Sequence, residues 1–259
     1  MRDFADRTGA ALVVGGSGGL GLAIARMLAS RGSDVALTYR SRPEAGAAAV
    51  EAVREWGQHA TSYALDLGAP TAVSDAAAVV DAAVAAHGGL HTLVYAAGPH
   101  VPMVHLSEVE PAAMADQLAA DAAGFFAVVR PALPVLREAQ GSVVAVTTAA
   151  TARYPVRDGL SSAPKAAVEA IVRALAAEEG RYGVRVNAVG PGMLTDGMAA
   201  RLISSGELSD DALAAARRNI PLRRFGTATD VAEAVCFLAS DRAGFVSGQK
   251  LDVDGGFGV

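Results

Sequence analysis

The segment ALVVGGSGGLGLAIARMLA, residues 11–29, most narrows what this chain can fold into. Its four apolar residues predict a buried strand, a glycine-rich turn follows, and the apolar spacing after the turn predicts an amphipathic helix. Gly15, Gly19 and Gly21 have the spacing G-x-x-x-G-x-G. Glycines permit a tight turn and a close approach of the backbone to a pyrophosphate, whose charge then meets the helix N-terminus. This order of elements predicts a dinucleotide-binding βαβ unit, with a purely structural glycine turn as the alternative.

The rest of the chain repeats this organisation. Short apolar runs alternate with longer helical patterns, which is the sequence form of successive βαβ units and a parallel sheet. The runs are continuous rather than alternating, as expected for strands buried on both faces. One such domain, residues 1–259, accommodates the whole chain. We expect an α/β fold with a doubly wound, seven-stranded parallel sheet (a Rossmann fold), whose strands lie at 11–14, 35–39, 62–65, 92–95, 143–147, 185–189 and 250–253.

The least regular stretch is residues 192–222, between the last two predicted strands. It contains LSDDALAAARRN, in which Ser209 can cap a helix and Asp210 and Asp211 suit the positive end of the helix dipole. A helical insertion at the carboxyl edge of the sheet predicts a small lid over the ligand crevice, before the last strand. A surface excursion without a lid function is the alternative.

Composition excludes several classes of protein. Apolar residues make up 52% and charged residues 19% of the chain, which supports a large core and argues against disorder. The net charge of −5 disfavours a nucleic-acid partner. The sequence has no unbroken apolar run of membrane-spanning length, and MRDFADRTG is not a signal peptide, so we expect a cytoplasmic protein with no membrane span. The single cysteine, Cys236, is expected in the core, and no metal site is predicted.

The end of the second predicted strand bears on the choice of cofactor. A carboxylate there would hold the ribose hydroxyls of NAD, but Tyr39 occupies the position and Arg40 and Ser41 follow. A guanidinium matches the planar geometry of a 2′-phosphate, so NADP(H) is the expected cofactor, although a solvated arginine is the alternative. Asp66, after the third strand, is placed either to accept a hydrogen bond from the adenine amino group or to cap a helix.

Four stretches resemble the short-chain dehydrogenase/reductase family. VGGSGGLG resembles its TGxxxGxG loop, with Val14 in place of threonine, and LVYAAG resembles its LVNNAG strand. RVNAVGPGMLTDGM and PLRRFGTATDVAEAVCFLASDRAGFVSGQKLDVDGG resemble its RVNxxxPGxxxTxM segment and its C-terminal helix and strand. The likeness covers about residues 10–256. It implies that the cofactor contacts Gly15, Ser17, Gly18, Gly19, Leu20, Gly21, Tyr39, Arg40, Ser41, Asp66, Leu67, Ala96, Ala97, Gly98, Lys165, Pro191, Gly192, Leu194 and Thr195.

The resemblance also locates a degenerate catalytic tetrad. Members of the family use asparagine, serine, tyrosine and lysine, with Y-x-x-x-K at the centre. Lys165 aligns with the lysine, because KAAVEAIVRALA resembles the helix that follows it, but Ser161 stands at the tyrosine position. Thr148 stands at the serine position and Asp121 at the asparagine position. Lys165 is expected to hold the nicotinamide ribose. Asp121 either pairs with Lys165 or is a solvated helix residue.

The missing tyrosine leaves the source of the carbonyl proton open. A serine hydroxyl is a far weaker acid than a phenol and is shorter by a ring. Tyr154 is one candidate acid, with packing against the lid as the alternative. Tyr95, His100 and His105 follow the fourth strand and are candidates as well, although each is more often a packing or loop residue. A substrate phenol beside the carbonyl is the third source, a situation similar to that in atypical angucyclinone ketoreductases.

These observations favour an NADPH-dependent ketoreductase for a bulky, aromatic polyketide ketone, working by an atypical, substrate-assisted mechanism. A non-catalytic NADP-binding sensor or partner subunit is the alternative from another class. Reduction of a conjugated C=C bond is a further alternative. The family resemblance implies a homo-oligomer, a tetramer or a dimer.

Overall fold

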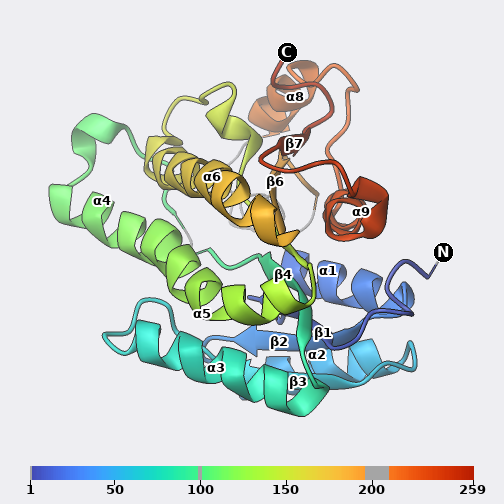
Figure 1. Cartoon of the computed structure of the whole chain (residues 1–259). Helices are drawn as coiled ribbons and strands as arrows, with labels where there is room; N and C mark the ends of the chain where they lie inside the picture. The colour runs from blue at the N-terminus through green and yellow to red at the C-terminus, as the bar shows by residue number, and fades with distance from the viewer. Residues whose placement is uncertain (1, 99–100, 196–209) are drawn as a thin grey trace.

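The computed structural model describes residues 2–98, 101–195 and 210–259, and its centre is a parallel sheet flanked by helices (Figure 1). The strand order is β3-β2-β1-β4-β5-β6-β7. Each predicted strand is present, with no boundary more than two residues from its expected place. The strands are β1 (Ala10–Val14), β2 (Asp34–Tyr39), β3 (Ala60–Ala64), β4 (Leu90–Tyr95), β5 (Ser142–Val146), β6 (Arg185–Pro191) and β7 (Lys250–Val253).

Helices connect the strands and cover both faces of the sheet. The longer helices are α1 (Gly19–Ser30), α2 (Pro43–Arg54), α3 (Ala72–His87), α4 (Pro111–Leu118), α5 (Gly124–Glu138), α6 (Gly159–Glu179), α8 (Asp210–Arg218) and α9 (Ala228–Ala239). The short helical turns are η1 (Leu106–Glu108), η2 (Ala119–Ala123), η3 (Ala149–Thr151), η4 (Gly180–Tyr182) and η5 (Asp241–Ala243). All seven strands run parallel, so the fold is the doubly wound Rossmann architecture that the sequence predicts.

Each face of the sheet has its own hydrophobic core. Alternate residues of a strand point to opposite faces, so Leu12 and Val14 of β1 pack with α3, α5 and α6, while Ala11 and Val13 pack with α1, α2 and α9. The single cysteine, Cys236, is fully buried in the second core, and burial raises the pKa of its thiol to about 12. The expectation of an inert core thiol is therefore confirmed.

The strand order reverses between β1 and β4, which places the carboxyl ends of these two strands at the switch point of the sheet. Connections leave in opposite directions at this point and open a crevice, which is where ligands bind in open α/β sheets. The glycine-rich loop between β1 and α1 lies at this edge.

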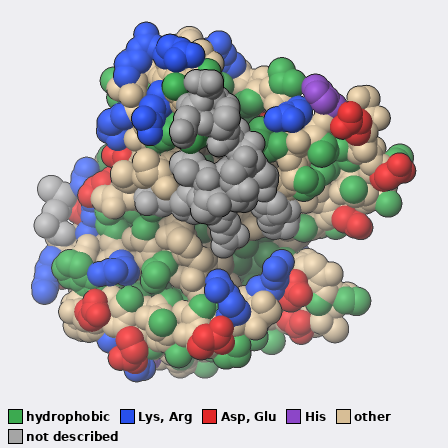
Figure 2. Space-filling view, turned by 180° about the vertical axis from the view of Figure 1, so that it is seen from behind, with side chains coloured by type: hydrophobic (Ala, Val, Ile, Leu, Met, Phe, Trp, Pro, Cys, Tyr) green, Lys and Arg blue, Asp and Glu red, His purple; other side chains and the backbone are tan. Residues whose placement is uncertain are grey.

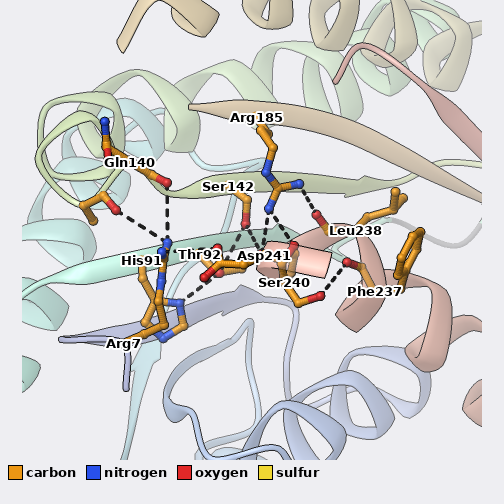
Figure 3. Close-up of polar contacts among 12 residues, drawn as sticks. Arg7, His91, Thr92, Gln140, Ser142, Arg185, Phe237, Leu238, Ser240 and Asp241 are labelled. Carbon is orange, nitrogen blue, oxygen red and sulfur yellow. Dashed lines mark hydrogen bonds and ion pairs between the residues drawn. The ribbon is translucent and has the colours of Figure 1, made fainter. Parts of the chain in front are cut away.

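A row of buried, hydrogen-bonded polar side chains runs across the amino-terminal ends of β2, β4 and β5 (Figure 3). His91 Nε2 lies 3.2 Å from Ser33 Oγ, and His91 Nδ1 lies 3.0 Å from Thr92 Oγ1. Ser142 Oγ continues the row to the last turn of α9 by donating to the Ala239 carbonyl at 3.0 Å. Burial lowers the pKa of His91 to about 3, so the imidazole is neutral throughout the physiological pH range.

One continuous helix, Pro111–Glu138, runs through α4, η2 and α5 and is long and apolar enough to span a bilayer by length and composition. In the fold 33% of its most apolar stretch is buried. Its α5 portion packs on α3 and β4, its α4 portion packs on α6, and the fully buried Asp121 lies in its middle. Among the described residues, no other helix passes the same test of length and hydropathy.

The segment before the last strand contains the predicted helix, α8. Leu213 of α8 forms a small separate hydrophobic cluster with Ile220 and Phe225, and Phe257 near the C-terminus packs against it. Figure 1 shows α8 beside β7 and the C-terminus. The expected N-cap, Ser209, lies outside the described residues.

Candidate functional site

The glycine loop after β1 is shaped by contacts that exclude any side chain. Gly15 has a φ of +80°, and its N–H donates to Thr38 Oγ1 at 2.9 Å. A Cβ on Gly21 would lie only 2.2 Å from the Gly15 carbonyl oxygen. Helix α1 begins directly after the loop, and no side chain caps its N-terminus. The first-turn N–H groups of α1 are therefore available to an anion, as the sequence predicts for a pyrophosphate.

The carboxyl end of β2 carries no acidic residue. The Tyr39 ring lies over α2, where a Cβ on Gly46 would come within 2.4 Å of it, and Arg40 is exposed beside it. Asp66 Oδ1 accepts a hydrogen bond from the Gly68 N–H at 3.0 Å in the loop after β3. Thr71 is the N-cap of α3, so the alternative of Asp66 as a helix cap is wrong.

The loop after β4 contacts both the glycine loop and Lys165. The Ala96 N–H donates to the Val14 carbonyl at 2.9 Å, and a Cβ on Gly15 would lie 2.9 Å from Ala97 Cα. Two residues later, a Cβ on Gly98 would lie 3.3 Å from Lys165 Nζ. The loop residues predicted to contact the cofactor thus pack between the glycine loop and the predicted catalytic lysine.

Lys165 of α6 forms an ion pair with Asp121 of η2. The Asp121 side chain is 1% exposed and that of Lys165 is 13% exposed. The second carboxylate oxygen of Asp121 accepts a hydrogen bond from Gln117 Nε2 at 3.2 Å. Of the two alternatives for Asp121, pairing with Lys165 is therefore the one that the structure shows, and solvation on a helix surface is wrong.

Asp121 reaches Lys165 from a single π-helical turn, η2, inside the continuous helix. A π-turn widens the helix by one residue and displaces the backbone groups there from their usual partners. The Tyr95 hydroxyl donates to the Ala120 carbonyl at 3.1 Å and lies 3.4 Å from the Asp121 carbonyl. Tyr95 at the end of β4 therefore holds the turn that presents Asp121.

The expectation that Tyr95 is a candidate proton donor is corrected by this arrangement. Its side chain is fully buried, and its ring packs edge-on against Phe125 at 5.3 Å between centroids. Burial raises the pKa of the Tyr95 phenol, and the nearby Asp121 carboxylate raises it further. A group with this environment does not give up a proton near neutral pH. The alternative of a packing residue holds for Tyr95.

Thr148 and Ser161 lie on separate elements of the site. Thr148 follows β5, and its Oγ1 accepts a hydrogen bond from the Ala150 N–H at 3.1 Å as the cap of η3. Ser161 lies in the first turn of α6, one turn before Lys165 and thus on the same side of the helix. The Ser161 N–H donates to the Asp158 carbonyl at 3.0 Å.

The other candidate acids, Tyr154, His100 and His105, are not part of the Lys165–Asp121 cluster as far as the structure describes them. Tyr154 is 60% exposed in the loop between η3 and α6. His105 is exposed before η1, and His100 lies outside the described residues. Neither Tyr154 nor His105 forms a hydrogen bond or ion pair with Lys165 or Asp121 in the part of the chain that the structure describes, so the roles of these side chains stay predictions.

Two features of the candidate site, Asp158 and Lys250, were not predicted from the sequence. Asp158 precedes α6, and burial raises the pKa of its carboxyl to about 6, which brings this acid close to neutrality. Lys250 of β7 contacts the loop that carries Thr148. Its Nζ donates to the Thr148 carbonyl at 3.1 Å and lies 3.5 Å from the Glu169 carboxylate. The only signal in the sequence was the rarity of lysine, because Lys165 and Lys250 are the two lysines of the chain.

The segment after β6 closes the described part of the site. The Gly192 N–H donates to the Val253 carbonyl at 2.9 Å, and a Cβ on Gly192 would lie 2.7 Å from Asp254 Cα. Leu194 forms an isolated bridge with Gly226, and the Thr195 N–H donates to the Gly226 carbonyl at 2.8 Å. These pairs fix the residues that follow Pro191 at the carboxyl end of the sheet.

The geometry fits a dinucleotide at this edge. A Cβ at Gly15, Gly16 or Gly21 would collide with neighbouring atoms, no described side chain caps the N-terminus of α1, and the Lys165 ammonium lies beside Gly98. The residues that would hold the cofactor are the glycine loop for the pyrophosphate, the β2 end for the adenosine ribose and Lys165 for the nicotinamide ribose.

Figure 2 shows the rear of the molecule, where basic and acidic side chains both lie among apolar ones.

Comparison with known proteins places the chain in a family. Residues 14–258 match the family described as enoyl-(acyl carrier protein) reductase. Versicolorin reductase stcU of Emericella nidulans is 34% identical over 252 residues, which cover 95% of this chain and 94% of that protein. The 3-oxoacyl-[acyl-carrier-protein] reductase FabG of Staphylococcus aureus is 33% identical over 252 residues, which cover 96% and 98%.

Solved structures agree with these relatives. A short-chain type dehydrogenase/reductase from Mycobacterium ulcerans has a TM-score of 0.90 at 30% identity, covering 99% of this chain and 91% of that one. A short-chain dehydrogenase from Burkholderia cenocepacia, solved in complex with NADP, has a TM-score of 0.85 at 30% identity, covering 98% and 100%. The chain therefore belongs to the short-chain dehydrogenase/reductase superfamily, a family of oxidoreductases that bind NAD(P)H.

Proposed function

We propose that this protein is an NADPH-dependent ketoreductase whose substrate, a bulky aromatic polyketide ketone of the angucyclinone type, supplies the carbonyl proton itself. The observation that carries the proposal is the buried Lys165–Asp121 pair beside Gly98, combined with Ser161 at the tyrosine position. The machinery for placing a nicotinamide is intact, while the usual proton donor is replaced by a short hydroxyl. The relatives named versicolorin reductase and 3-oxoacyl-[acyl-carrier-protein] reductase support ketone reduction and a polyketide-related substrate.

The preference for NADPH rests on the end of β2. Arg40 is exposed there, and neither Tyr39 nor Ser41 provides the carboxylate that would hold two ribose hydroxyls. An arginine fork binds a phosphate with two hydrogen bonds, which a ribose hydroxyl cannot match. The NADP in the related Burkholderia cenocepacia structure supports the same preference.

The chain's own residues divide the work of the reaction. A bound nicotinamide would supply a hydride, which adds to the carbonyl carbon of the substrate. Lys165, oriented by Asp121, holds the ribose and places a positive charge near the developing alkoxide. The Thr148 hydroxyl, whose oxygen accepts from the Ala150 N–H just after β5, donates its proton in a hydrogen bond to the substrate oxygen. A phenol adjacent to the ketone passes its proton to that oxygen, and the phenolate left behind regains a proton from solvent.

Three further features belong to the proposal. The described part of residues 192–222, which includes α8, contributes to a lid over the crevice of a single domain spanning residues 1–259. The chain assembles as a homo-oligomer, which the fully exposed Phe245 and the exposed Leu251 near the C-terminus support. The protein acts on a small-molecule ketone in the cytoplasm.

The decisive experiment compares two ketones, one with a free phenol beside the carbonyl and one with that phenol O-methylated. We expect NADPH oxidation with the free phenol and a loss of about 100-fold or more with the methyl ether, the usual contribution of a general acid. Ser161→Tyr is the matched variant, because it restores Y-x-x-x-K. It should raise turnover of the methyl ether far more than turnover of the free phenol.

Other results would assign the function differently. Equal turnover of both ketones would overturn substrate assistance. Loss of activity in Tyr154→Phe with the free phenol would make Tyr154 the acid. Absence of NADPH oxidation with any ketone, together with tight NADPH binding, would favour the sensor or partner subunit.

Reduction of a conjugated C=C bond is the second candidate, because the matching family is described as an enoyl reductase. In that reaction hydride adds to a carbon remote from the carbonyl, and the demand for an acid at the oxygen changes. Mass and NMR analysis of the product from an enone substrate distinguishes a saturated ketone from an allylic alcohol. A saturated ketone would establish the C=C reductase.

A further inference from the structure

Three ligand-type side chains meet at the amino-terminal edge of the sheet, on the side opposite the glycine loop. Asp34 begins β2, His59 directly precedes β3, and His87 is the last residue of α3. Their closest ligand atoms, one from each side chain, all lie within 4.8 Å of one another. The residues are far apart in sequence and share no motif, so the fold alone brings them together.

The backbone holds two of these residues in place. β2 and β3 are paired in parallel with Val35 opposite Ala60, and the His59 N–H donates to Asp34 Oδ1 at 2.9 Å. The rings of His59 and His87 lie side by side, with centroids 4.4 Å apart. The cluster therefore stands on the ends of two strands and a helix rather than on a free loop, and a rigid base of this kind preorganises a ligand set.

His87 is the residue that points to a ligand. Its side chain is fully buried, and its Nε2 lies 2.9 Å from Thr61 Oγ1. Its other ring nitrogen, Nδ1, has no hydrogen-bond partner within the described chain, and the Asp34 carboxylate oxygen that it faces is 3.9 Å away. A buried polar atom without a partner is costly, and a cation between Nδ1 and the facing Asp34 carboxylate would provide a partner for both.

We propose that Asp34, His59 and His87 bind a divalent transition-metal ion of the zinc class. Two imidazoles and one carboxylate form a ligand set that zinc uses, with water completing the tetrahedron. Thr61 Oγ1 lies 2.9 Å from His87 Nε2, and by accepting its N–H in the metal-bound form it would leave Nδ1 as the ligand, which is the usual task of a second partner on a ligating histidine. The carboxyl end of α3 is the negative end of its dipole and favours a cation. The exposed His59 ring closes onto the ion.

The site ties β2, β3 and α3 together far from the proposed hydride transfer, so its effect is on stability. Zinc is titrated into chelator-treated protein against a chromophoric zinc indicator at pH 7.5, with and without NADPH. We expect one zinc ion per chain with a micromolar or tighter dissociation constant. At a hundredfold excess over that constant, zinc should raise Tm by about 5–10 °C. NADPH should change neither result.

Variants of the ligands locate the ion. His59→Gln, His87→Gln and Asp34→Asn should each weaken zinc binding by about tenfold or more and abolish the Tm shift. His105→Gln, which alters an exposed histidine outside the cluster, is the matched control and should bind as the unaltered chain does. Because His59 is exposed, its variant should fold even if a change at buried His87 does not. Absence of zinc binding, or binding unchanged in His59→Gln, would overturn the proposal.

Discussion

Removing the hydroxyl of Tyr95 would separate a positioning role at the site from proton donation. In Tyr95→Phe the Ala120 carbonyl of the π-turn loses the 3.1 Å hydrogen bond that the fully buried Tyr95 side chain donates to it. An intramolecular hydrogen bond contributes about 0.5–1.5 kcal/mol, so the free energy of unfolding should fall by about that amount. Asp121 should then hold Lys165 less firmly, and we expect kcat/KM to fall by less than about tenfold, whereas loss of a general acid would cost about 10²–10⁴-fold.

Urea unfolding at pH 7 measures the first effect through the midpoint at constant m-value, and NADPH oxidation measures the second. Tyr63→Phe is the matched control. Its hydroxyl donates to the Ala82 carbonyl at 3.2 Å, so it should cost similar stability without touching the site. A stability equal to that of the unaltered chain would refute the claim that Tyr95 holds the π-turn. A loss of turnover above about 100-fold at unchanged stability would restore Tyr95 as the acid.

Three further predictions concern the cofactor loop and the buried histidine. Arg40→Ala should raise KM for NADPH by about tenfold or more and leave KM for NADH nearly unchanged, because only NADPH carries the 2′-phosphate; equal changes would contradict the assignment. Gly21→Ala should abolish NADPH binding in a fluorescence titration, since its Cβ would lie 2.2 Å from the Gly15 carbonyl oxygen, and binding at unchanged affinity would show that the loop moves freely. The pKa of His91 falls from 6.5 to about 3 on folding. Between these two values His91 is protonated in the unfolded chain and neutral in the folded chain. The free energy of unfolding should therefore decline by about 1.4 kcal/mol per pH unit between pH 6.5 and pH 3 through this residue, and urea unfolding of His91→Asn at pH 5 and 7 should show a smaller decline.

The sheet could be predicted from the sequence because burial on both faces leaves continuous apolar runs. The strand at 143–147, for example, is observed at Ser142–Val146. The glycine loop could be predicted for a similar reason, since backbone crowding at Gly15 and Gly21 excludes every other residue. Local rules of this kind act within one element and its immediate neighbours.

The pairings within the site could not be predicted in the same way. Whether Asp121 meets Lys165 depends on a π-turn, and no propensity marks that extra residue in AADAA. Tyr95 is the last residue of β4, before a loop that resembles a cofactor contact, but the pleat of the strand directs its ring into the core beside α5. The cluster of Asp34, His59 and His87 depends on the register of β2 with β3, which only the folded sheet determines.

Lysine is almost absent from this chain, and its two copies have a practical consequence. Lys165 pairs with Asp121, and Lys250 contacts the Thr148 loop, so the surface elsewhere offers arginine as its cationic side chain. Apart from the α-amino group at the N-terminus, the amines that acylating or methylating reagents can modify therefore lie in the proposed active-site region rather than over the general surface. Isotope-labelled reductive methylation would give NMR signals that report directly on ligand binding, whereas amine coupling to a sensor chip would risk blocking the site under study.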